Sequence, residues 1–135
     1  IIIYKYSMKK ILAEISVGEL LDKLTILEIK LEKIRDKDSL KIIEKEYQAL
    51  KNTDLSEIDK KKYKPLFDEL KSINRKLWDI ENEKRLCEKK SDFGEKFIKV
   101  SRDVHFMNDN RAKVKSKINK IFGSSIEEVK EYTKY

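Results

Sequence analysis

Residues 16–35 read SVGELLDKLTILEIKLEKIR and set the fold expected for the whole chain. Apolar residues recur there in alternating steps of three and four, the spacing that keeps one face of a helix apolar. This apolar seam consists of Val17, Leu20, Leu24, Leu27, Leu31 and Ile34. Ser16 and Glu19 have the spacing of a capping box, in which two side chains satisfy the first free amides of a helix. The stretch therefore predicts a long helix that opens at Ser16 and runs to about Arg35.

The rest of the chain continues the helical pattern. A medium helix is expected over residues 40–50, and two long helices are expected to begin near Lys64 and at Asp92. Gly123 is placed to end the last long helix, because glycine favours the left-handed conformation of a helix C-terminus. Ser125, followed three residues later by a glutamate, predicts a short final helix. The expected fold is all-α, an antiparallel helical bundle of three long helices, one medium helix and a short C-terminal helix.

Composition indicates one helical domain. The chain has 135 residues, of which 42% are charged and 39% hydrophobic, with only 3 glycines and 1 proline to interrupt helices. We expect a single domain over residues 8–135 and interpret residues 1–7, ahead of Met8, as an extra arm or a non-native extension. Cys87 is the single cysteine, which excludes an internal disulfide and fits a cytoplasmic protein. No segment approaches the roughly 18 apolar residues of a membrane span, so no membrane association is expected.

The net charge of +7 at pH 7 raises the question of an anionic partner. Lysines dominate this charge and arginines are few, whereas the reading of base edges in nucleic acids relies mainly on Arg, Asn and Gln. The densest basic run, residues 60–64, lies next to acidic residues. The pattern therefore favours a helical surface of mixed charge over a nucleic-acid interface.

Two charged residues fall where the helical pattern asks for apolar ones. Glu28 lies within the seam of the first helix, and Arg111 lies on the apolar face of the last long helix. Asn108 and Lys115 flank Arg111 on that face, and Lys84 occupies an apolar position of the third long helix. A charge in a core costs free energy unless it is paired. These five residues are the candidate ligand-binding residues, and they indicate either a buried Glu28–Arg111 ion pair or a core cavity for an anionic ligand.

Other chemical motifs are sparse. Glu19 and Asp22 are secondary acidic candidates, because carboxylates three residues apart on a helix can share a Mg²⁺ ion when a second helix supplies more. No convincing second pair faces them, so capping and the helix dipole account for both. His105 is the only histidine, which excludes a multi-histidine metal site. No metal and no cofactor are expected, and no catalytic residue is assigned.

Residues 14–30 read EISVGELLDKLTILEIK and residues 108–115 read NDNRAKVK. Together with Trp78, these stretches resemble the signatures of a family of small uncharacterised helical proteins from bacteria and phages, a domain of unknown function. The resemblance covers most of residues 8–132. It implies neighbours in cell-surface sugar metabolism, and it implies no activity and no role for any single residue.

Three functions remain open at this point. The leading hypothesis is a non-enzymatic binding or adaptor module that forms a homodimer or binds a protein partner, because regular heptad seams also serve packing between chains. The alternative is a small-molecule enzyme or sensor that binds an anionic metabolite in the bundle core. The third is nucleic-acid binding through the basic surface.

Overall fold

The computed structural model describes residues 10–135, which fold into four helices without a strand. Their bounds are α1 (Val17–Lys33), α2 (Lys37–Lys51), α3 (Lys60–Lys89) and α4 (Glu95–Phe122). The all-α architecture expected from the sequence is confirmed. Within the described range, no helix combines the length and the apolar character that crossing a membrane requires. The predicted arm at residues 1–7 lies outside the described residues.

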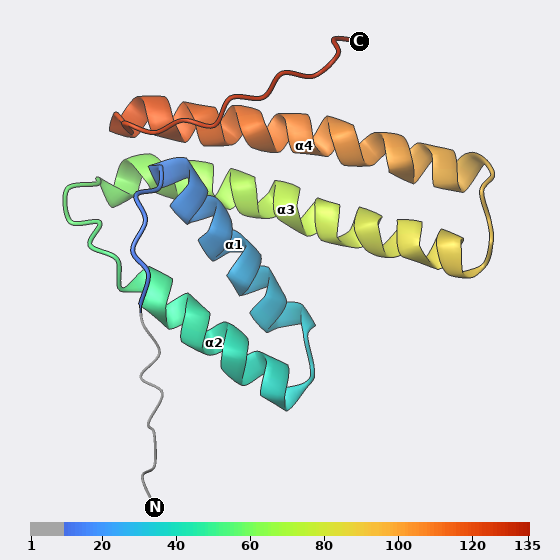
Figure 1. Cartoon of the computed structure of the whole chain (residues 1–135), viewed down its shortest axis with the longest axis horizontal. Coiled ribbons are helices and arrows are strands. Elements are labelled where there is room, and N and C mark those ends of the chain that lie inside the picture. Colours follow the sequence, from blue (N-terminus) through green and yellow to red (C-terminus); the bar gives the residue numbers. More distant parts are fainter. Residues whose placement is uncertain (1–9) are drawn as a thin grey trace, which may run out of the picture.

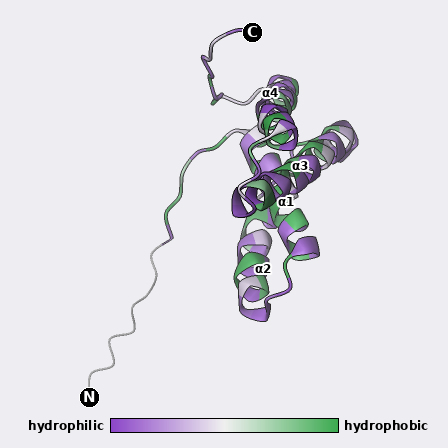
Figure 2. Cartoon of the chain, turned by 90° about the vertical axis from the view of Figure 1, so that its right-hand side faces the viewer, coloured by the Kyte–Doolittle hydropathy of each residue, from purple (hydrophilic) through white to green (hydrophobic). Residues whose placement is uncertain are grey.

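The two longest helices, α3 and α4, form an antiparallel hairpin (Figure 1). Helix α1 lies obliquely against one half of this hairpin and contacts both of its helices, whereas α2 packs on α1. Viewed from the end of the hairpin where residues 90–94 connect α3 to α4, α4, α3, α1 and α2 follow one another in layers (Figure 2). The other half of the hairpin, toward residues 90–94, extends beyond α1 (Figure 1). We call this half the distal hairpin.

The hydrophobic core lies where α1 meets α3 and α4. Its buried members are Leu20, Leu21 and Leu24 of α1, Leu66, Leu70, Ile73 and Leu77 of α3, and Val114 and Ile118 of α4. Burying a side chain of this size stabilises the fold by about 1.5–3 kcal/mol relative to leaving it exposed. Leu27 and Ile29 of α1 are also buried, Leu27 on the same helix face as Leu20 and Leu24. Helix α1 is therefore the central helix of the fold and contacts all three others.

The local capping signals predicted two helix ends correctly and two incorrectly. The Ser16 hydroxyl accepts the amide of Glu19 at 3.1 Å, and Gly123 ends α4 at φ 61°, both as predicted. Helix α3 begins at Lys60, about one turn earlier than expected, because the Asp59 carboxylate caps it. The N-cap of α4 is Gly94 rather than Asp92, and it makes no side-chain capping bond.

The predicted short helix after Ser125 is absent, because residues 124–135 are not helical. The Ser124 hydroxyl accepts the amide of Val17 at 3.1 Å, and the Ser125 hydroxyl donates to Glu14 at 2.7 Å. The serine expected to cap a new helix is thus bonded to the segment that precedes α1. Tertiary contacts replace the local capping that the sequence pattern predicted.

At Gly18, α1 and α4 pack closely against one another. The Gly18 amide donates to the Asn119 side chain at 2.7 Å, and a Cβ atom at this position would lie 2.7 Å from the Lys115 carbonyl oxygen. We expect Gly18→Ala to lower the free energy of unfolding by about 1–3 kcal/mol, because the added methyl group forces the two helices apart. Urea denaturation measures this change.

Gly94→Ala serves as the control for this prediction. A Cβ atom at Gly94 would meet only the Asp92 carboxylate, at 3.4 Å. The expected loss is under about 1 kcal/mol, the effect of a changed helix cap. Equal losses in the two variants would contradict the close packing at Gly18.

Candidate functional site

A buried carboxylate joins α1 to both helices of the hairpin. Asp22, only 1% exposed, accepts two hydrogen bonds from Arg111, from Nε to Oδ1 at 2.9 Å and from Nη2 to Oδ2 at 2.5 Å. Asn74 donates from Nδ2 both to Asp22 Oδ1 and to the Thr25 hydroxyl, each at 2.8 Å. Paired bonds of this kind between a guanidinium and a carboxylate are both strong and directional. Asp22 is therefore held by donors from α3 and from α4.

Lys115 extends this arrangement toward the start of α1. Its ammonium group donates to Glu19 Oε2 at 2.6 Å and lies 3.6 Å from Asp22 Oδ2. It also lies 3.4 Å from Glu128, which belongs to the C-terminal segment, residues 124–135. We call Glu19, Asp22, Asn74, Arg111 and Lys115 the polar network. The expected secondary acidic pair thus supplies the carboxylates that Arg111 and Lys115 bind.

Both cations of the polar network keep their charge. The hydrogen bonds to Asp22 raise the pKa of Arg111 above its ordinary value, although burial opposes the charge. Burial also opposes the charge of Lys115, but the hydrogen bond to Glu19 and the nearby carboxylates outweigh it and raise the pKa of Lys115. Glu19, Asp22 and Glu128 therefore balance Arg111 and Lys115. No surplus positive charge remains here, so the network is suited to fixing helices rather than to binding an anion.

The predicted Glu28–Arg111 pair is wrong. Glu28 instead accepts the Tyr47 hydroxyl at 3.1 Å and lies 3.1 Å from the ammonium group of Lys71. Glu28 follows Asp22 by six residues, which places the two side chains on helix faces about 120° apart. Asp22 faces α4, whereas Glu28 reaches α2 and α3.

The predicted core cavity of Glu28, Asn108, Arg111 and Lys115 does not form as one unit. Lys84 and Asn108 are half-buried, and neither side chain makes a hydrogen bond or an ion pair within residues 10–135. Sequence reasoning also missed Asn74 and Asn119, which are buried and bonded to α1. Each asparagine follows directly after an apolar core residue, which is the signal that marks them.

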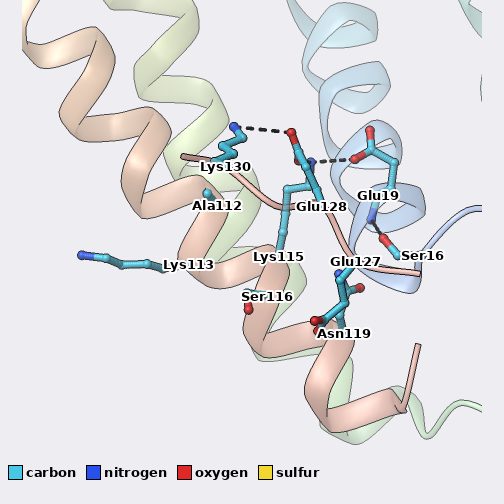
Figure 3. Close-up of a pocket in the computed structure, with 10 residues that line it drawn as sticks. All are labelled: Ser16, Glu19, Ala112, Lys113, Lys115, Ser116, Asn119, Glu127, Glu128 and Lys130. Atoms are coloured by element: carbon cyan, nitrogen blue, oxygen red, sulfur yellow. Dashed lines mark hydrogen bonds and ion pairs between the residues drawn. The ribbon is translucent and has the colours of Figure 1, made fainter. Parts of the chain in front are cut away.

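The first opening beside the polar network lies on the side of the C-terminal segment. A pocket of about 250 Å³ is enclosed by α1, α4 and this segment, with Lys115 and Glu128 pointing toward one another (Figure 3). Glu128 also lies 3.8 Å from the ammonium group of Lys130. Carboxylates and ammonium groups therefore alternate along the pocket, and their mixture selects no single ligand charge.

The second opening is a groove of about 320 Å³ between α1 and α3. Its residues are Ile26, Ile29, Leu77 and Trp78, which are mainly apolar, and Asn74, Glu81, Asn82, Arg85 and Arg111, which are polar. We call it the Trp78 groove. Arg111 reaches it from the polar network, and its Nη1 is the guanidinium nitrogen that no side chain of the described chain engages. The groove offers an exposed apolar surface with two arginines.

No group of three or more His, Cys, Asp or Glu side chains between residues 10 and 135 is arranged to hold a metal ion. In the described part of the chain, the candidate site therefore consists of ion pairs, amide hydrogen bonds and apolar surface.

The polar network predicts an asymmetric response to substitution. Arg111→Gln is expected to lower the free energy of unfolding by about 3 kcal/mol, because it leaves Asp22 buried without its charged partner. The double variant Asp22→Asn/Arg111→Gln is expected to recover part of this loss, since no isolated charge remains. Urea denaturation of both variants measures the difference.

Arg75→Gln is a matched control, because Arg75 forms an exposed ion pair with Glu32 at 2.6 Å. Its expected loss is about 0–1 kcal/mol. A double variant less stable than Arg111→Gln would argue against the buried charge as the cause.

Comparison with known proteins gives one result. Neither the comparison with curated proteins nor that with solved structures finds a match. A family of unknown function (DUF6165) matches residues 10–135, nearly the whole chain. The protein therefore belongs to this family of unknown function, DUF6165.

Proposed function

We propose that the chain is a non-enzymatic protein-binding module and that the Trp78 groove is its docking surface for a second copy of the chain. The observation that carries the proposal is Trp78, half-buried on an open apolar surface beside Arg85 and Arg111. Trp and Arg are the residues that most often dominate the binding free energy of an interface. A groove with both residue types around an apolar floor fits a protein partner.

The distal hairpin supports this proposal, because it lacks a covering helix in the described structure. The contact of Lys33 with Asp79, at 3.4 Å, joins the last turn of α1 to α3. Beyond it, large apolar side chains remain exposed, among them Phe93 at 53% and Ile98 at 55%. A second copy of the chain would supply two further helices to cover this open face, and together the four would form a four-helix bundle.

Charge complementarity favours a second copy over an acidic or a basic partner. Glu81 and Arg85 lie one turn apart on α3, line the Trp78 groove, and form no ion pair with any residue of the described chain. A two-fold axis perpendicular to α3 would place two α3 helices antiparallel, so that each Arg85 meets the Glu81 of the other copy. The same contact is then made twice.

The two other hypotheses receive less support. An anionic metabolite in the core would need free cations, and Arg111 and Lys115 are bonded to carboxylates. A nucleic acid in the Trp78 groove would meet Glu81 as well as Arg85. The paired charges also favour a binding role over catalysis.

Size-exclusion chromatography with light scattering tests the proposal. We expect the wild-type chain to elute with twice its 16.1 kDa mass. Arg85→Glu is expected to return it to the monomer mass, because two like-charged pairs then face each other across the axis. Glu81→Arg/Arg85→Glu reverses both charges and is expected to restore the dimer.

Ile42→Ala provides a matched control on a different surface, because Ile42 is 71% exposed on α2. It is expected to leave the mass of the dimer unchanged. A wild-type chain that stays monomeric at every concentration, or a charge-reversed double variant that stays monomeric while wild type dimerises, would rule out the proposed arrangement.

A further inference from the structure

A third concave surface lies between α1, the end of α2 and the start of α3. It has a volume of about 400 Å³ and shares no residue with the Trp78 groove. We call it the aromatic pocket. The charged and aromatic side chains that line it are Glu28, Tyr47, Lys51, Lys60, Tyr63, Lys64 and Phe67. Its volume lies within the range of pockets that hold small molecules, about 300–1,000 Å³.

Three half-buried aromatic side chains give this pocket its character, Tyr47 from α2 and Tyr63 and Phe67 from α3. The Tyr47 hydroxyl is fixed by its bond to Glu28. The Tyr63 ring makes an edge contact with Phe122, with a centroid distance of 6.4 Å and an interplanar angle of 69°. Rings held in this way lose little conformational freedom when a flat ligand packs on them.

The charged groups of the pocket leave a positive surplus. Its one carboxylate, Glu28, is already engaged by the ammonium group of Lys71 at 3.1 Å. Lys64 pairs with Asp68 of its own helix, whereas Lys51 and Lys60 have no carboxylate partner within residues 10–135. The ammonium group of Lys51 lies 5.4 Å from the centre of the Tyr47 ring. Cations without partners therefore stand at the aromatic surface.

We infer that the aromatic pocket binds an aromatic ring that carries a phosphate group, the chemistry of a nucleoside monophosphate. The ring packs against the tyrosines and Phe67, and the phosphate lies among Lys51, Lys60 and Lys64. Lysine suits a phosphate as a mobile point charge, and several lysines together favour a multiply charged anion over a carboxylate. The inference is independent of the proposed self-association, because the two surfaces have separate residues.

Isothermal titration calorimetry of the full chain with adenosine monophosphate tests the inference, with adenosine and inorganic phosphate as separate titrants. The nucleotide is expected to bind at least about tenfold more tightly than either part alone, because only it uses both the rings and the lysines. Equal binding of adenosine would overturn the role of the phosphate. Equal binding of inorganic phosphate would overturn the role of the rings.

A charge-matched pair of variants assigns the site. The test variant removes three pocket lysines, K51Q, K60Q and K64Q. The control variant removes three exposed lysines at the start of α2, K37Q, K41Q and K45Q. The test variant is expected to weaken nucleotide binding about tenfold or more, and the control about twofold or less.

Phe67→Leu addresses the aromatic part of the site and is also expected to weaken nucleotide binding, with thermal unfolding recorded to confirm that the variant is folded. The absence of nucleotide binding to the wild-type chain overturns the inference, as does an equal loss in the two lysine variants. Either result leaves the self-association test unaffected.

Discussion

Asp22 is a carboxylate in the interior of the fold, and the placement of α1 depends on keeping it paired. An ionised carboxylate without partners in an apolar interior is strongly unfavourable. Here two hydrogen bonds from Arg111 and one from Asn74 offset that cost. The three donors come from two different helices, so α1 can neither slide nor rotate without losing at least one of them. Apolar packing drives the helices together, and Asp22 selects the register in which they meet.

The architecture was predictable because the information for it is local. The seam of residues 16–35 and the caps at Ser16 and Gly123 act within a few turns, and the structure has all three. The pairing of Arg111 was not predictable in the same way. A helical wheel gives the direction of a side chain around its own axis, but not the angle at which two axes cross. Glu28 looked like the partner because it interrupts the seam, and the crossing of α1 presents Asp22 instead.

The prediction of a short C-terminal helix was wrong for a different reason. Ser125 has the local pattern of a helix cap, but a helix of a few residues gains little from its own hydrogen bonds. Bonds to Glu14 and Lys115 from the C-terminal segment replace it. The aromatic pocket was equally hidden from sequence reasoning, since Tyr47 and Tyr63 belong to separate helices. Their meeting depends on the turn between α2 and α3.

Helix α2 packs on α1 and buries only Ile43 fully. It is therefore the element with the smallest share of the core, and its detachment would leave the contacts among α1, α3 and α4 intact. In proteins, such elements open as cooperative subunits well below the free energy of global unfolding. Because α2 also forms one wall of the aromatic pocket, local opening of α2 would open the pocket as well. The stability of this single helix would set both how quickly the pocket opens to solvent and how well an occupant is retained.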